Sequence, residues 1–170
     1  MDLLKELSNV KLLPSLFVFD LDYTLWPSWI DTHTSGSPFK ADPFKPHCVK
    51  DRHGKLLKLY SDVPEIFRLI KNCPKPHIAV ASRTHEPEWA CKVLSIMPFP
   101  ADEGCDSIKN SSNGVNYRSL ADIIDYDEIY PGSKLKHFRS LHKKSGIPYH
   151  EMIFFDDELR NKEVERELGR

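Results

Sequence analysis

Two carboxylates separated by a single residue, Asp20 and Asp22, directly follow the apolar run Leu16–Phe19. When a buried strand ends in acids, negative charge comes to the rim of a hydrophobic sheet, where a carboxylate without a partner is costly. We therefore expect a metal ion or a basic group beside these aspartates. On their own, the two residues are also compatible with the start of a polar loop, so other parts of the chain must decide.

Two later apolar runs, 77–82 and 152–155, also stop abruptly at polar residues. The residues at these ends are Ser82, Arg83, Asp156 and Asp157. Taken alone, Ser82 and Arg83 would be assigned to a helix-capping turn. The recurrence of polar residues after three apolar runs makes a shared site the stronger hypothesis.

Helix signals lie between the predicted strands. Asp62 and Glu65 form a capping pattern, with Pro64 in the first turn, ahead of a helix that extends to about Asn72. Thr84 is placed to cap a second helix. Further helices are predicted through 135–141 and 163–170, and a further short strand over 127–130.

Strands that alternate with helices predict an α/β fold, a Rossmann-like parallel sheet sandwiched by helices. Right-handed crossovers bring the carboxyl ends of all parallel strands to one edge of the sheet, where ligands bind in such folds. The polar clusters after the three apolar runs should therefore converge there.

The length of 170 residues predicts one domain over 1–170. Within it, about 27–60 is rich in proline and has weak periodicity, which predicts an irregular flap with a hairpin turn at 52–54. The segment of about 98–125 is polar and hard to interpret, and we expect a surface insertion.

The composition argues against several classes of partner. Lys plus Arg number 24 and Asp plus Glu 25, so the net charge of -1 gives no global attraction to nucleic acid or anionic lipid. The four cysteines show no zinc-site spacing. No apolar run approaches a membrane span or a signal core. We expect a cytoplasmic monomer that binds neither nucleic acid nor membrane.

The converging acids also predict a cofactor. Several carboxylates in a small space repel one another, and a hard divalent cation that prefers oxygen ligands relieves this repulsion, with Mg²⁺ the natural candidate. Ser82, Arg83 and Lys134 could hold phosphate oxygens beside such an ion. A carboxylate that attacks phosphorus would form an aspartyl-phosphate, and a second carboxyl two residues away could protonate the leaving oxygen.

The sequence resembles the haloacid dehalogenase superfamily of phosphohydrolases, whose four motifs occur in order. These are Asp20-Leu-Asp-Tyr-Thr-Leu25, Ser82, Lys134 and the pair Asp156-Asp157. The segments 19–27, 81–84, 129–134 and 154–158 are most similar to the eukaryotic magnesium-dependent phosphatase branch. The resemblance covers nearly the whole chain from Leu16 onward and implies a small flap in place of a cap domain.

The resemblance implies a role for each residue of the first motif. Asp20 would be the nucleophile and a metal ligand, and Asp22 the general acid and base, with its backbone carbonyl on the metal. The backbone N–H of Leu21 would bind the phosphate.

The later motifs would complete the site. By the same resemblance, Ser82 and Arg83 would bind phosphate or substrate, and Lys134 would neutralise the nucleophile and the phosphoryl group. Members with a double aspartate usually place the second one on the metal, so Asp157 is the expected ligand and Asp156 would lie behind it.

The resemblance implies two kinds of phosphomonoester substrate, phosphotyrosine on proteins and phosphorylated sugars or glycated amines, and the sequence does not choose between them. The family usually continues into another strand and a final helix, so an edge strand could be missing from the sheet. A truncated, non-catalytic binding protein is the alternative function.

Two groups of residues outside the motifs receive structural assignments. Trp26 and Trp29 could pack under the flap or line a substrate surface, and core packing is the favoured expectation. Several histidines without a partner pattern are expected at the surface: His33, His53, His137 and His142.

Overall fold

A four-stranded parallel sheet forms the centre of the computed structural model, which describes residues 13–42, 46–100 and 117–169. The strands are β1 (Leu16–Phe19), β5 (His77–Ser82), β8 (Tyr126–Ile129) and β9 (Met152–Phe155). Their order across the sheet is β8-β5-β1-β9, and every neighbouring pair is parallel. The parallel α/β fold and the strands predicted from the sequence are confirmed.

The register of the sheet aligns the strand ends that precede the polar clusters. Phe19, the last residue of β1, is paired with Val80 of β5 and with Phe155, the last residue of β9. The chain positions that follow β1 and β9 therefore start side by side, and this is the edge at which the sequence predicts a site.

Side chains of the central strand point alternately to the two faces of the sheet, as the period of a strand requires. Leu16 and Val18 belong to one buried cluster, together with Phe138 of α5 (Lys134–Ser145) and Val164 of α6 (Glu163–Leu168). Phe19 belongs to the other cluster. That cluster includes buried residues of α3 (Val63–Lys71) and α4 (Pro87–Ile96).

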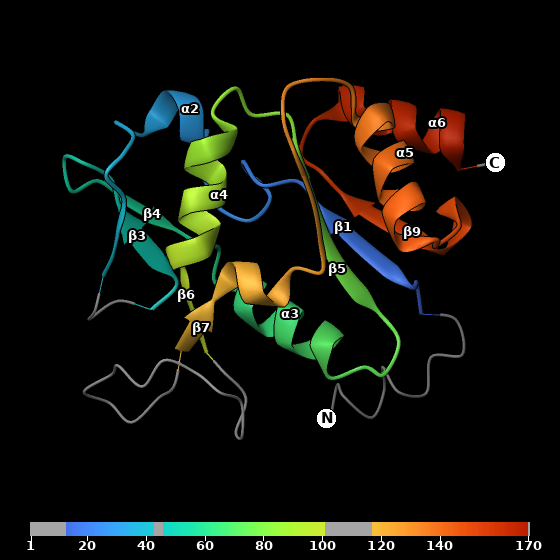
Figure 1. Cartoon of the computed structure of the whole chain (residues 1–170), viewed down its shortest axis with the longest axis horizontal. Coiled ribbons are helices and arrows are strands. Elements are labelled where there is room, and N and C mark those ends of the chain that lie inside the picture. Colours follow the sequence, from blue (N-terminus) through green and yellow to red (C-terminus); the bar gives the residue numbers. More distant parts are fainter. Residues whose placement is uncertain (1–12, 43–45, 101–116, 170) are drawn as a thin grey trace.

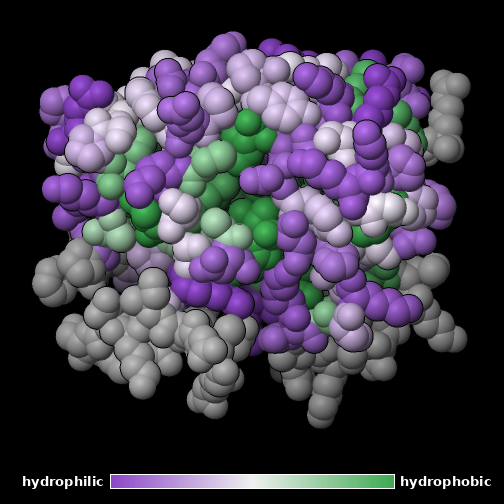
Figure 2. Space-filling model, in the orientation of Figure 1, coloured by the Kyte–Doolittle hydropathy of each residue, from purple (hydrophilic) through white to green (hydrophobic). Residues whose placement is uncertain are grey.

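The helices thus cover both faces of the sheet, α3 and α4 on one and α5 and α6 on the other (Figure 1). Short helices complete this part of the chain: α2 (Ile30–His33), η1 (Leu120–Ile123), η2 (Tyr149–Glu151) and η3 (Leu159–Lys162). Hydrophilic side chains cover most of the face in Figure 2, with apolar patches between them. None of the helices in the described residues is long and apolar enough to cross a membrane.

Two of the predicted helix caps differ from the structure. Asp62 does precede α3, but its side chain makes no capping hydrogen bond and instead accepts one from the Ser61 hydroxyl. α4 begins at Pro87, three residues after Thr84, whose hydroxyl accepts the backbone N–H of Glu86. Local side-chain bonds of this kind compete with capping, which the sequence pattern does not reveal.

The predicted flap contains more regular structure than expected. Strands β2 (Lys40–Ala41), β3 (Cys48–Lys50) and β4 (Leu56–Lys58) form a small antiparallel sheet, and the predicted hairpin turn joins β3 to β4. Asp51 closes that turn by accepting the backbone N–H groups of His53 and Lys55.

The ends of the predicted surface insertion lie in the core instead. β6 (Pro98–Pro100) is paired antiparallel with β7 (Tyr117–Ser119), and η1 follows directly. Phe99, Leu120 and Ile123 are buried in the cluster under α3 and α4. The expectation of an insertion confined to the surface is therefore wrong for both ends, while 101–116 lies outside the described residues.

Candidate active site

The predicted site residues surround a cleft at the carboxyl ends of β1, β5 and β9. Its volume is about 310 Å³. Six of the eight predicted residues line it: Asp20, Asp22, Ser82, Arg83, Lys134 and Asp157. Leu21 and Asp156 do not line the cleft and lie beneath its floor, where both side chains are largely buried.

Asp20 is placed by the sheet itself, because its backbone N–H continues the pairing of β1 with β9 by donating to the Phe155 carbonyl at 2.9 Å. The residue is 8% exposed. Burial raises the pKa of Asp20 to about 7, although the Lys134 ammonium lowers it; repulsion by Asp156 and Asp22 raises it further. Additional positive charge close to Asp20 would therefore favour the ionised carboxylate over the protonated acid.

Lys134 is a fully buried cation at the first turn of α5, with 1% of its side chain exposed. Its Nζ donates to Oδ1 of Asp20 at 2.5 Å and lies 3.0 Å from Oδ2 of Asp156; it also donates to the Ala81 carbonyl. A cation at a helix N-terminus is mildly unfavourable, so the two carboxylates account for its position.

Asp22 is held in one orientation by groups that follow it in the chain. Its Oδ1 accepts the indole N–H of Trp26 at 2.7 Å and the backbone N–H of Ile30 at 3.2 Å. Burial raises the pKa of Asp22 to about 6, and the bond from Trp26 partly offsets this. None of the described residues donates a hydrogen bond to Oδ2 of Asp22.

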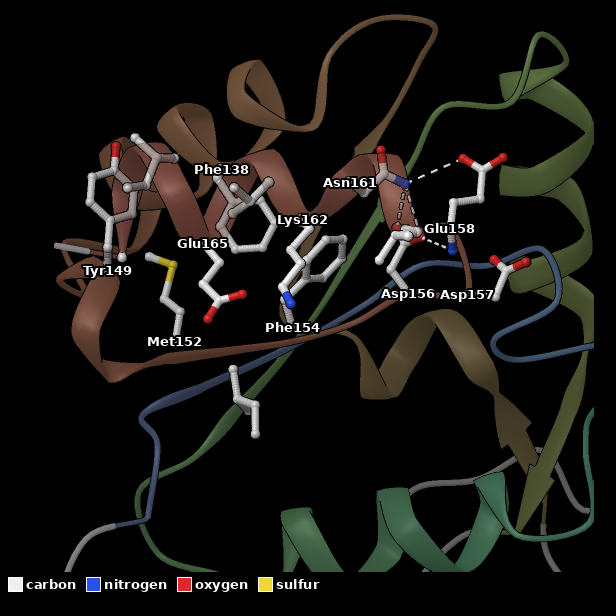
Figure 3. Close-up of a pocket in the computed structure, with 15 residues that line it drawn as sticks. Phe138, Tyr149, Met152, Phe154, Asp156, Asp157, Glu158, Asn161, Lys162 and Glu165 are labelled. Atoms are coloured by element: carbon white, nitrogen blue, oxygen red, sulfur yellow. Dashed lines mark hydrogen bonds between the residues drawn. The ribbon is translucent and has the colours of Figure 1, made fainter.

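The two acids after β9 differ in their surroundings (Figure 3). Asp156 is 5% exposed at its side chain; Asn161 donates to both of its oxygens at 2.9 Å, and the Glu158 backbone N–H donates to Oδ1 at 2.8 Å. Asp157 points away from this cluster, is exposed and lines the cleft. Burial, and then the neighbouring Asp156, raise the pKa of Asp157.

The predicted phosphate ligands Ser82 and Arg83 also line the cleft. Ser82 is 1% exposed and its hydroxyl accepts the Thr84 backbone N–H at 3.4 Å. Arg83 donates from Nη1 to Oδ1 of Asn161 at 3.2 Å. The side chain of Leu21 is fully buried, so only its backbone could contact a ligand.

Sequence reasoning missed several residues at the site. Asn161 links Asp156 to Arg83 and is 2% exposed, but no sequence signal distinguishes it. Trp26 has the signal of lying four residues after Asp22, and its predicted burial is confirmed. Trp29 was assigned to the core and is instead 45% exposed in the cleft. Further lining residues that sequence reasoning missed are Asp31, His85, Glu158 and Arg160.

The donor set of the cleft fits a hard divalent cation. Asp20, Asp22 and Asp157 supply oxygen only, and the burial and mutual repulsion that raise their pKa values are what a cation would relieve. Among the described residues no three His, Cys, Asp or Glu side chains form a ready-made metal cage. Mg²⁺ does not require one, because it commonly retains several waters and binds through one or two carboxylates.

A larger cavity, about 550 Å³, lies between β9, α5 and α6 (Figure 3). Its lining is mainly apolar, with Phe138, Met152, Phe154, Val164 and Leu168. It shares only Asp157 and Glu158 with the cleft. The convergence of acids, a buried lysine and the predicted phosphate ligands makes the smaller cleft the candidate active site.

Comparisons with known proteins show the family to which the chain belongs. A family model described as Acid Phosphatase matches residues 12–170. A HAD-like hydrolase superfamily protein of Schizosaccharomyces pombe is 43% identical over 153 residues, which cover 90% of this chain and 81% of that protein. Magnesium-dependent phosphatase 1 of Homo sapiens is 42% identical over 149 residues, covering 88% of this chain and 70% of that protein.

Two further matches are more distant. A putative magnesium-dependent phosphatase of Saccharomyces cerevisiae is 34% identical over 167 residues, covering 90% of this chain and 82% of that protein. The solved N-terminal part of a Bacteroides fragilis protein, which contains a phosphatase domain complexed with Mg, has a TM-score of 0.53 and 16% identity. That match covers 95% of this chain and 35% of the other, and at this identity it supports the fold alone.

Proposed function

Because the chain belongs to the acid phosphatase family, among the haloacid dehalogenase-like hydrolases, we propose that it is a magnesium-dependent phosphomonoester hydrolase that works through an aspartyl-phosphate on Asp20. The chain is thus a phosphatase, and a phosphate ester is its substrate. The observation that carries the mechanism is the contact of Lys134 with Asp20 in a cleft that also contains Asp22.

In the first step, a carboxylate oxygen of Asp20 attacks phosphorus while the bond from phosphorus to the leaving oxygen breaks. The leaving oxygen takes a proton from the Asp22 carboxyl group. The fixed orientation of Asp22, through Trp26 and Ile30, supports this role because proton transfer requires a positioned donor.

In the second step, water attacks phosphorus, its proton passes to Asp22, and the bond between phosphorus and Asp20 breaks. Inorganic phosphate is released and the Asp20 carboxylate is restored. Lys134, the Ser82 hydroxyl, Arg83 and the backbone N–H of Leu21 would stabilise the charge on the phosphoryl oxygens in both steps.

The residues that would hold Mg²⁺ are Asp20 and Asp157 through their side chains and Asp22 through its backbone carbonyl. When bound, the ion would neutralise charge on the carboxylates and on the phosphoryl oxygens. Asp156 would support the metal ligands without binding Mg²⁺ itself, because Asn161, the Glu158 backbone and Lys134 already contact its oxygens.

The substrates that the family resemblance implies are phosphotyrosine on proteins and phosphorylated sugars or glycated amines. The three-stranded flap over 40–58 is small, which supports a cleft accessible to either class. We also propose that residues 1–170 form one phosphatase domain.

The function is tested by hydrolysis of 4-nitrophenyl phosphate with Mg²⁺, with EDTA, and by Asp20→Asn with Mg²⁺. We expect turnover only by the wild-type enzyme with Mg²⁺. When that reaction is quenched with acid, the peptide that contains Asp20 should carry a phosphoryl group. Asp62→Asn, an exposed aspartate remote from the cleft, is the matched control and should retain full turnover. Equal turnover in wild type and Asp20→Asn would reject the mechanism.

A further inference from the structure

We propose that Trp29 selects phosphomonoesters whose leaving group carries an aromatic ring, by stacking against that ring in the cleft. This inference rests on the proposed function, and it adds a specificity-determining residue that lies outside the four motifs. The tryptophan itself is recognisable from its exposure, from the aromatic residues that hold it and from its position relative to Asp22.

The exposure of Trp29 is unusual for its residue type. Its side chain is 45% exposed and lines the cleft, whereas Trp26, three residues earlier, is fully buried. Tryptophan contributes a large apolar surface that is usually covered in a folded protein. An exposed indole inside a polar cleft is therefore suited to contact with an apolar part of a ligand.

Two aromatic neighbours hold the indole in place. His33 stacks on it, with ring centroids 5.1 Å apart and planes 26° apart, and Nδ1 of His33 accepts the Trp29 backbone N–H at 3.2 Å. Tyr23 lies edge-on at 5.3 Å and 78°. A side chain held by its neighbours loses little conformational entropy when a ligand binds.

These contacts leave one indole face uncovered by either ring. Tyr23 is 6.2 Å from His33 and 5.3 Å from Trp29, so it lies beside the stack of His33 and Trp29. If Tyr23 lay on the indole face opposite His33, its ring would be much farther from His33 than 6.2 Å, so Tyr23 does not cover that face. Tyr23 also adopts a φ of 56°, a left-handed conformation that bulky residues rarely adopt and that is often found near functional sites.

The position of Trp29 assigns it to the leaving group. Ile30, the next residue, donates its backbone N–H to Asp22, the proposed proton donor, at 3.2 Å. Since that proton goes to the leaving oxygen, the leaving group must lie on the side of Asp22. Ser82 and Lys134, on β5 and α5, would hold the phosphoryl oxygens instead.

Two of the acids that line the cleft, Asp31 and Glu158, have partners of their own. Asp31 Oδ2 lies 3.7 Å from Nδ1 of His85 and accepts the His85 backbone N–H at 3.4 Å. Glu158 pairs with Arg160 at 2.6 Å. A neutral ring entering beside Trp29 would therefore not have to strip an isolated charge of water.

The test compares two non-hydrolysable phosphonates, phenylphosphonate and methylphosphonate, titrated by calorimetry into the full chain with Mg²⁺. Stacking of one aromatic pair corresponds to about tenfold in affinity. Trp29→Ala should weaken phenylphosphonate about tenfold and change methylphosphonate less than about twofold, while Trp29→Phe should retain most of the affinity. Ile66→Ala removes another exposed apolar side chain, outside the cleft, and should change neither.

Loss of affinity by the same factor for both phosphonates, or no loss for either, would overturn the role of Trp29. If Trp29→Ala lost affinity for phenylphosphonate alone, and the wild-type protein did not hydrolyse 4-nitrophenyl phosphate, the role of Trp29 would stand and the proposed function would be rejected. The two failures are therefore distinguishable.

Discussion

The Nζ of Lys134 lies 2.5 Å from Oδ1 of Asp20, a carboxylate 114 residues earlier in the chain. The same Nζ lies 3.0 Å from Asp156, so one buried cation neutralises acids that follow two different strands. Burial of these three charges is tolerable only while all of them are present. This arrangement couples the chemistry of the cleft to the stability of the fold.

Lys134→Met should therefore lower both the stability of the fold and the rate of catalysis. Removing one partner of a buried charge cluster costs about 3–5 kcal/mol of unfolding free energy, and loss of a group that stabilises the phosphoryl charge lowers kcat by about 10²–10³. Denaturant unfolding and the kcat for 4-nitrophenyl phosphate measure the two effects. Lys143→Met, on the exposed side of the same helix, should change neither, and wild-type kcat in Lys134→Met would contradict the assigned role.

Asp156→Asn and Asp157→Asn should differ in their response to Mg²⁺. Asp157 lines the cleft, so its substitution should raise the Mg²⁺ concentration for half-maximal activity by about 10–100-fold. Asp156 is bonded to Asn161 and Lys134, so its substitution should mainly lower kcat and stability. Titration of activity against Mg²⁺ distinguishes the two variants. A larger Mg²⁺ requirement in Asp156→Asn than in Asp157→Asn would make Asp156 the metal ligand instead.

His137, which is fully buried and not at the surface as predicted, should contribute a part of the pH dependence of stability that is unfavourable in acid. Asp20 and Asp22 act in the opposite direction, because their raised pKa values make the folded chain bind protons before the unfolded chain does. Burial lowers the pKa of His137 to about 4, while the unfolded histidine titrates near the ordinary pKa of 6.5. Between these values the unfolded chain binds a proton that the folded chain does not. The His137 contribution therefore makes unfolding more favourable as the pH falls from 6.5 to 4, by up to ~3 kcal/mol.

Urea unfolding at several pH values between 4 and 7 measures this dependence. His137→Phe should remove this contribution, so that its unfolding free energy falls less than that of the wild type, or rises more, as the pH is lowered over that range. His150→Gln, at an exposed histidine, is the control and should keep the wild-type slope. An unchanged slope in His137→Phe would show that other groups, and not His137, determine how the unfolding free energy depends on pH.

Asp51 should be structural and not catalytic. Its carboxylate accepts three backbone N–H groups, those of Ser35, His53 and Lys55, and it is 6% exposed. Asp51→Ala leaves these donors without their partner and should cost about 1–3 kcal/mol of unfolding free energy. The kcat at 25 °C should stay within about twofold of wild type, and a loss of kcat comparable to that of Lys134→Met would count against a purely structural role.

The sequence by itself determined the fold class and the location of the candidate site. Apolar runs of strand length alternate with helix signals, and in a parallel sheet the residues after each strand are brought to one edge. For this reason the sequence alone assigns Asp20, Ser82 and Asp157 to one cleft. The motif order then connected Lys134 to the same place.

Tertiary structure alone decided the burial of His137 and Asn161 and the exposure of Trp29. His137 is buried because its face of α5 covers the sheet, and Asn161 is buried because η3 folds over Asp156. Trp29 stays exposed because α2 turns it into the cleft against Tyr23 and His33. Burial depends on neighbours that are distant in the sequence, so local composition and spacing could not predict it.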